Sequence, residues 1–151
     1  MSVLLLTSAA EAEAACRTVS GRYTERDAGG AGCASPVGLC IAGEYRGDVR
    51  GAFDGAATAL IPTADTTSSG VVLFTSDSTI TAHIGNRSGT LVVKNAGASR
   101  TVTDGSIVDV QTIVGGTGDF AGASGAIRAS GTFVDGAGTS EYTGTVCRPT
   151  T

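Results

Sequence analysis

The chain has 151 residues, with 10 Lys and Arg against 14 Asp and Glu, so its net charge of −4 argues against a nucleic-acid binder. Hydrophobic residues make up 41% and charged residues 16%, which excludes a disordered chain, and 23 Gly without a triplet period exclude a collagen-like one. No apolar run approaches the roughly 18 residues that span a bilayer, and the length fits one domain.

The first 15 residues, MSVLLLTSAAEAEAA, resemble the end of a secretory signal. A short apolar run over 3–6 precedes small residues and two Ala-x-Ala patterns. No Lys or Arg precedes Arg17, which fits a start site placed too far downstream and a longer natural leader. We expect a truncated signal peptide over 1–15, a single domain over 16–151, and a secreted or periplasmic protein. The alternative is an Ala-rich helical N-terminus of a cytosolic protein.

Four cysteines, Cys16, Cys33, Cys40 and Cys147, support export, because an even count in a small secreted chain indicates disulfides. Three pairings are open. Cys33 and Cys40 bracket a short loop and are expected to pair locally, which leaves Cys16 with Cys147. A zinc site is the rival interpretation, but the spacings hold no Cys-x2-Cys pair and His83 is the single histidine. We therefore expect no metal.

Apolar and polar residues alternate after Cys16, and turn residues separate the runs, as in Gly85-Asn86-Arg87 and Asp135-Gly136. The pattern predicts eight or nine strands, depending on whether 38–42 is separate. Their expected ranges are 17–26, 38–42, 46–61, 70–75, 79–84, 89–95, 106–114, 126–134 and 140–147. The connections are too short for crossover helices, so the strands should be antiparallel neighbours.

Glycines recur on strand faces that also carry apolar residues. The shared faces are Val49, Phe53 and Ala57 with Gly51 and Gly55; Ile80, Ala82 and Ile84; and Ile127, Ala129, Gly131 and Phe133. Repeated glycine on one face fits a tightly bent sheet or a small barrel whose interior lacks room for every side chain. A Cys16–Cys147 bond is natural if the first and last strands are neighbours. We predict an all-β, closed eight-stranded antiparallel barrel, with a two-sheet β-sandwich as the alternative.

The segment over 114–127, V-GGTGDFAGASG-AI, lies between two predicted strands. Its glycines predict turns with positive φ and close backbone packing around Phe120, which should insert as an anchor. A phosphate-binding loop is excluded, because no helix follows and no Gly-Lys-Ser/Thr is present. We expect no cofactor.

This segment closely resembles the Gly-Gly-Thr-Gly-x-Phe hallmark of plant dirigent proteins and the Gly-Gly-x-Gly-x-Phe segment of allene oxide cyclases. The run over 85–92 and the strand carrying Gly47, Gly51, Phe53 and Gly55 are similar to the pattern of bacterial allene oxide cyclase barrel-like proteins. The resemblance covers about residues 40–147 and places the chain among bacterial secreted members of that superfamily. It implies an eight-stranded barrel, dimeric or trimeric, with a cavity open at one end. The segment bearing Cys33 and Cys40 has no counterpart that we can assign in either plant family.

Polar residues inside strand bodies are the remaining candidates. Asp109 and Gln111 share one face, and the first interpretation is that they form a solvated outer face with Arg128 and Glu141. The alternative is that Asp109 and Arg128, on strands joined by the 115–125 loop, pair inside the cavity and polarise a ligand.

Tyr23 and Tyr142 are expected at the cavity wall or rim, since a phenol offers an apolar body with one polar tip. The ligand-binding candidates are thus Tyr23, Asp109, Arg128 and Tyr142. His83 is expected to be a surface strand residue rather than a base.

Two functions are consistent with these features. The first is a secreted barrel that binds an apolar small molecule in its cavity and is non-catalytic or weakly catalytic, as the lack of an acid–base constellation favours. The alternative, implied by the resemblance alone, is a cyclase or isomerase that acts by confining its substrate. An open apolar cavity would favour a binder or an enzyme, and a filled interior would remove the enzyme interpretation.

Overall fold

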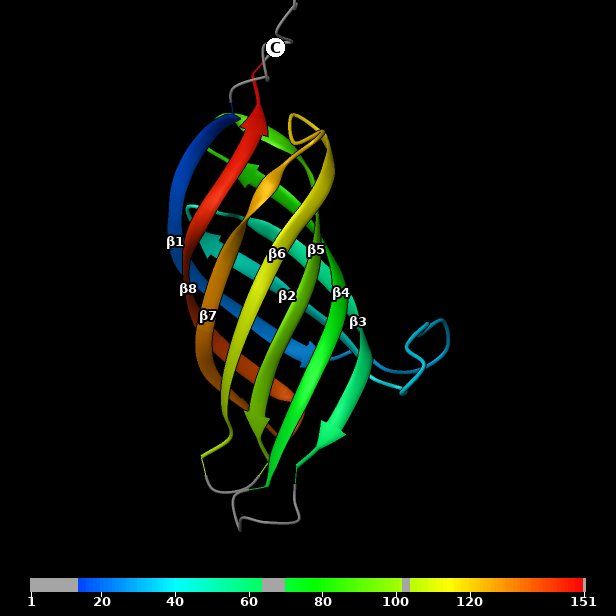
Figure 1. The fold of residues 1–151 in the computed structure, drawn as a ribbon. Coiled ribbons are helices and arrows are strands. Elements are labelled where there is room, and N and C mark those ends of the chain that lie inside the picture. Colours follow the sequence, from blue (N-terminus) through cyan, green and yellow to red (C-terminus); the bar gives the residue numbers. More distant parts are fainter. Residues whose placement is uncertain (1–13, 64–69, 102–103, 151) are drawn as a thin grey trace, which may run out of the picture.

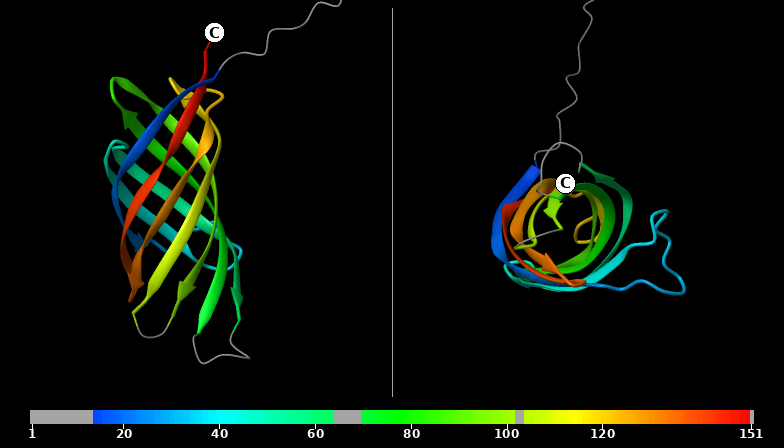
Figure 2. Two further views of the ribbon diagram at one scale, coloured as in Figure 1. Left: turned by 60° about the vertical axis from the view of Figure 1, so that its left-hand side comes forward. Right: turned by 90° about the horizontal axis from the view of Figure 1, so that it is seen from below.

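A computed structural model describes residues 14–63, 70–101 and 104–150, which form a closed barrel of eight strands (Figure 1). The strands are β1 (Ala14–Asp27), β2 (Cys40–Gly47), β3 (Gly51–Pro62), β4 (Val71–Ile84), β5 (Arg87–Arg100), β6 (Ser106–Gly118), β7 (Ser124–Val134) and β8 (Ala137–Pro149). Each strand pairs antiparallel with its chain neighbours, and β8 pairs with β1. The ring is closed when it is viewed along its axis (Figure 2). The predicted fold class is confirmed.

The strand boundaries correct the sequence interpretation in two places. The expected strand over 46–61 is two strands, because Gly47 and Gly51 adopt φ of 103° and 135° and turn the chain between β2 and β3. The expected strands over 70–75 and 79–84 are one strand, β4, which runs unbroken through Ser76 and Ser78. Residues 1–13 of the predicted leader lie outside the described residues.

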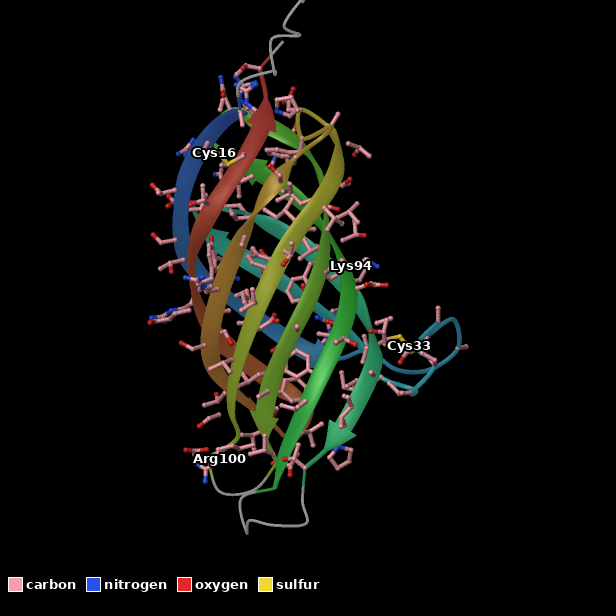
Figure 3. All side chains as sticks on the ribbon, in the orientation of Figure 1. Cys16, Cys33, Lys94 and Arg100 are labelled. Carbon is pink, nitrogen blue, oxygen red and sulfur yellow. A yellow bond between two sulfur atoms is a disulfide. The ribbon has the colours of Figure 1, made fainter. Side chains whose placement is uncertain are left out.

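Both expected disulfides are present. Cys16 lies directly opposite Cys147 in the β1–β8 pairing, so their bond fastens the two ends of the chain where the barrel closes. Cys33 is bonded to Cys40 and ties the projecting 28–39 loop to the start of β2 (Figure 3). The described residues contain no free cysteine and no helix long and apolar enough to cross a membrane.

The hydrophobic core fills one half of the barrel. We call the end that holds the Cys16–Cys147 bond the upper end. The side chains of the core include Val49, Ile80, Leu91, Val93 and Ile127, each at most 1% exposed. The predicted inward face of Ile80, Ala82 and Ile84 is confirmed, and Phe120 is buried as the expected anchor.

Inward aromatic rings lie directly opposite glycines on neighbouring strands. The pairs are Phe53 with Gly43, Phe74 with Gly97, Phe133 with Gly138, and Tyr142 with Gly21. A Cβ atom on Gly97 would lie 2.6 Å from the Phe74 ring, so the ring can rest flat on the strand only because no side chain is there. The glycines therefore let aromatic rings line the wall.

We expect Gly97→Ala to lower the free energy of unfolding by about 2 kcal/mol, because the new methyl group would meet the Phe74 ring and the Val108 carbonyl oxygen. Urea unfolding followed by circular dichroism measures the change. Gly115→Ala is the matched control on the adjacent strand, since a Cβ there meets nothing within 4 Å. Equal losses in the two variants would contradict this account of the glycines.

Candidate ligand-binding cavity

The lower half of the barrel encloses a cavity of about 260 Å³. Its walls are mostly apolar, and the apolar lining includes Leu39, Ile41, Phe53, Phe74, Ile107 and Phe133. An apolar cavity of roughly 150 Å³ is enough to hold benzene, so this one has room for an aromatic ring with small substituents. The volume lies just below the usual range of small-molecule sites.

A chain of hydrogen bonds crosses the cavity wall. The Tyr45 hydroxyl donates to Oε1 of Gln111 at 2.6 Å, and Nε2 of Gln111 donates to Oδ2 of Asp109 at 3.1 Å. Gln111 is only 2% exposed, and both ends of its amide are engaged. These two hydrogen bonds fix the orientation of the Asp109 carboxyl group.

Two carboxyl groups, Glu25 and Asp109, line the same cavity. Burial raises the pKa of Glu25 to about 7, and the nearby Asp109 carboxylate adds to the rise. Burial also raises the pKa of Asp109 to about 6, although its bond from Gln111 acts in the opposite direction. Both groups therefore exchange protons near neutral pH, the range in which acid–base chemistry is effective.

Buried oxygen atoms in the cavity lack partners. Oε1 of Glu25, Oδ1 of Asp109 and Oδ1 of Asn95 are buried and accept no hydrogen bond within the described part of the chain. Among the described residues that line the cavity, none is basic. The cavity therefore presents hydrogen-bond acceptors to a ligand and offers no positive charge.

Three aromatic rings form one side of the cavity. The Tyr23 ring centroid lies 4.9 Å from that of Tyr45 and 5.7 Å from that of Phe53, and Tyr45 and Phe53 are 5.1 Å apart. Burial raises the pKa values of both tyrosines, with further increases from nearby carboxylates, so both phenols stay protonated. The cluster gives an aromatic ligand several edges and faces to pack against.

Tyr23 and Asp109 thus lie in the cavity, but the preferred interpretation of the β6 faces was wrong. Asp109 and Gln111 point inward, whereas Val108 and Val110 are exposed at 54% and 43% on the outer wall. Gln111 can be buried because its amide oxygen accepts a hydrogen bond from the Tyr45 hydroxyl. The assumption that the apolar residues of a strand face inward is therefore wrong for β6.

Arg128 and Tyr142 do not line the cavity. Arg128 is exposed on the outer wall, because its buried neighbours Ile127 and Ala129 take the inward positions of β7, so the alternative pair with Asp109 does not form. The Tyr142 hydroxyl donates to the Arg46 carbonyl oxygen at 2.9 Å and accepts from the Val49 amide at 2.9 Å. These bonds make Tyr142 a support for the β2–β3 turn.

The outer wall holds the other polar candidates. Glu141 is exposed and pairs with Arg22 at 3.2 Å, as an outer-face residue should. His83 is exposed on β4, as expected.

Glu25, Tyr45 and Asn95 are cavity residues that sequence reasoning missed. Glu25 could have been found, because it lies two positions after Tyr23 and therefore on the same strand face. Tyr45 and Asn95 could not, since only the strand register and barrel closure bring them to the cavity.

No protein-family model and no curated protein matches the chain. Among solved structures it is similar to the pterocarpan synthase dirigent protein GePTS1, with 18% sequence identity over 95% of this chain and 90% of that chain. The TM-score of this likeness is 0.35.

Proposed function

We propose that this protein binds a small, mostly apolar molecule in the lower cavity of its barrel. The observation that carries the proposal is the cavity itself, which has mostly apolar walls and is lined by two carboxyl groups, Glu25 and Asp109. Such a chamber is the usual form of a small-molecule site.

The partnerless oxygen atoms define the polar end of the ligand. A buried acceptor without a donor costs roughly 1–3 kcal/mol, and a ligand hydroxyl or amine group that reaches Asp109 or Glu25 would remove part of that cost. The aromatic walls favour a ring as the apolar body. A phenol of the size of p-cresol meets both requirements.

p-Cresol is therefore expected to bind in the cavity, with chemical-shift changes in ¹H–¹⁵N spectra confined to the lower half of the barrel. Ser76→Phe is expected to weaken binding at least tenfold, because Ser76 lines the cavity and the added ring would occupy it. Thr79→Phe is the matched control on the same strand, since Thr79 is exposed on the outer wall.

The methyl ether 4-methylanisole tests the acceptor groups. It keeps the ring and the methyl group of p-cresol but has no donor, so we expect it to bind more weakly. Equal affinity of the two compounds would remove the donor requirement. Equal binding of p-cresol to the Ser76→Phe and wild-type proteins would place the ligand elsewhere and overturn the proposed function.

Cyclisation or isomerisation of a confined substrate is the second candidate. It is favoured by the carboxyl pair, since the pKa values of Glu25 and Asp109 suit proton transfer near pH 7. The superfamily resemblance of the 115–120 motif points to the same class of reaction. The variant Asp109→Asn separates catalysis from binding. It keeps the cavity and should still bind the ligand, but it should lose catalysis because its amide has no carboxyl proton to exchange.

We further propose that the protein works outside the cytosol, in a secreted or periplasmic location. Two disulfides fit an oxidising compartment, where such bonds form and persist. The predicted leader over residues 1–15 supports the same location.

A further inference from the structure

A second, smaller pocket of about 170 Å³ lies at the upper end of the barrel. It is separated from the lower cavity by the hydrophobic core, and its lining includes Arg17, Arg87 and Arg148 together with Ile84, Phe120 and Val146. Three of the ten basic residues of an acidic chain thus converge on one pocket.

The three arginines occupy inward positions of their strands. Arg17 lies two residues before the buried Val19, and Arg148 lies two residues after the buried Val146. Arg87 opens β5 opposite the buried Ile84. The alternation directs all three side chains toward the pocket, where Arg17 is exposed and Arg87 and Arg148 are half-buried. Figure 3 shows nitrogen-bearing side chains gathered at this end, above Cys16.

Within the described part of the chain, none of the three arginines forms an ion pair. The turns at this end carry Asp48 and Asp119, but these accept hydrogen bonds from the backbone amides of Ser20 and Ser88 and do not line the pocket. Three neighbouring positive charges that have no counter-charge among the described residues repel one another, and a bound anion would relieve that repulsion.

We propose that the upper pocket is an anion-binding site for the phosphate or sulfate group of a small organic ligand. Guanidinium groups match tetrahedral oxyanions with paired N–H donors, and the apolar floor of Ile84 and Phe120 accommodates a small apolar body. The Cys16–Cys147 bond holds the site together, because Arg17 and Arg148 each follow one of the two bonded cysteines.

Isothermal titration calorimetry of the full chain with phenyl phosphate and with inorganic phosphate, at low ionic strength and pH 7, tests the site. We expect one equivalent of phenyl phosphate to bind and its affinity to fall as salt is added. Arg17→Gln and Arg148→Gln should each weaken binding at least tenfold. Arg17→Lys should recover part of the loss, because it restores the charge without the paired donors.

Arg128→Gln is the matched control, because it removes the same charge from the outer wall and should leave the affinity unchanged. Far-UV circular dichroism confirms that each variant keeps the barrel. Equal affinities for inorganic phosphate and phenyl phosphate would show that the pocket binds the free oxyanion rather than an organic ligand. Absence of binding by both probes, or an equal loss in Arg128→Gln, would overturn the proposal. Ser76→Phe fills only the lower cavity, so it should weaken the binding of p-cresol and leave the binding of phenyl phosphate unchanged. Each of the two proposed sites can therefore be overturned without the other.

Discussion

Replacing Cys16 and Cys147 together by alanine is expected to lower the free energy of unfolding by about 5 kcal/mol. The bond joins residues 131 positions apart, and the entropy of closing a loop of that length gives this figure as an upper value. A loss of that size is a large part of the stability of a typical domain. The physical reason is that, without the bond, the two ends of the unfolded chain move independently, so the conformational entropy of the unfolded state rises.

The second disulfide supplies the comparison. Cys33 and Cys40 are 7 positions apart, so the same relation gives only about 2 kcal/mol for their joint replacement. Urea unfolding of the two double variants, followed by circular dichroism, measures both losses. A loss for Cys33 and Cys40 equal to or larger than that for Cys16 and Cys147 would contradict the role of the closure bond.

The folded protein is expected to lose stability as the pH rises from 4 to 8, because of Glu25 and Asp109. Their folded pKa values, about 7 and about 6, exceed the ordinary values of 4.5 and 3.8. Well below the ordinary pKa values of 4.5 and 3.8 both groups are protonated in either state, so their titration contributes nothing to the stability. Between the ordinary and the folded pKa values the unfolded chain ionises first, so stability falls until the pH passes about 7.

The variant Glu25→Gln with Asp109→Asn isolates this effect. One pKa unit corresponds to about 1.4 kcal/mol, so the wild-type stability minus the variant stability should fall by on the order of 3 kcal/mol or more across this range. Urea unfolding at each pH supplies the difference, and the variant cancels the contribution of every other titrating group. A difference that stays flat or rises with pH would show that these carboxyl groups are solvated.

Much of the fold could be predicted from the sequence, because local patterns determine it. Period-two alternation gave the strands, and turn residues such as Gly85-Asn86 placed the hairpins. The cysteine spacing led to both disulfides, and the glycines on strand faces, together with the family resemblance, led to the closed barrel with which a Cys16–Cys147 bond is consistent. The β2–β3 boundary failed, because Gly47 and Gly51 were interpreted as strand glycines although both turn the chain.

The site was harder to predict, because the inward face of a small barrel is not simply its apolar face. On β6 the valines face outward, and the interior takes Asp109 and Gln111. Tyr45 makes this arrangement stable by hydrogen bonding to Gln111, and that contact joins residues 66 positions apart. Sequence alternation identifies two faces of a strand, but only such long-range partners decide which face is inside.

The central claim is that the lower half of the barrel is hollow and accepts a small molecule. Nuclear Overhauser effects between bound p-cresol and the protein test it most directly, because Ile107 lines the cavity while the adjacent Val108 is exposed on the outer wall. We expect contacts from the ligand methyl group to Ile107 and Phe74 and none to Val108. Contacts to Val108 alone, or no contacts at all, would contradict the claim.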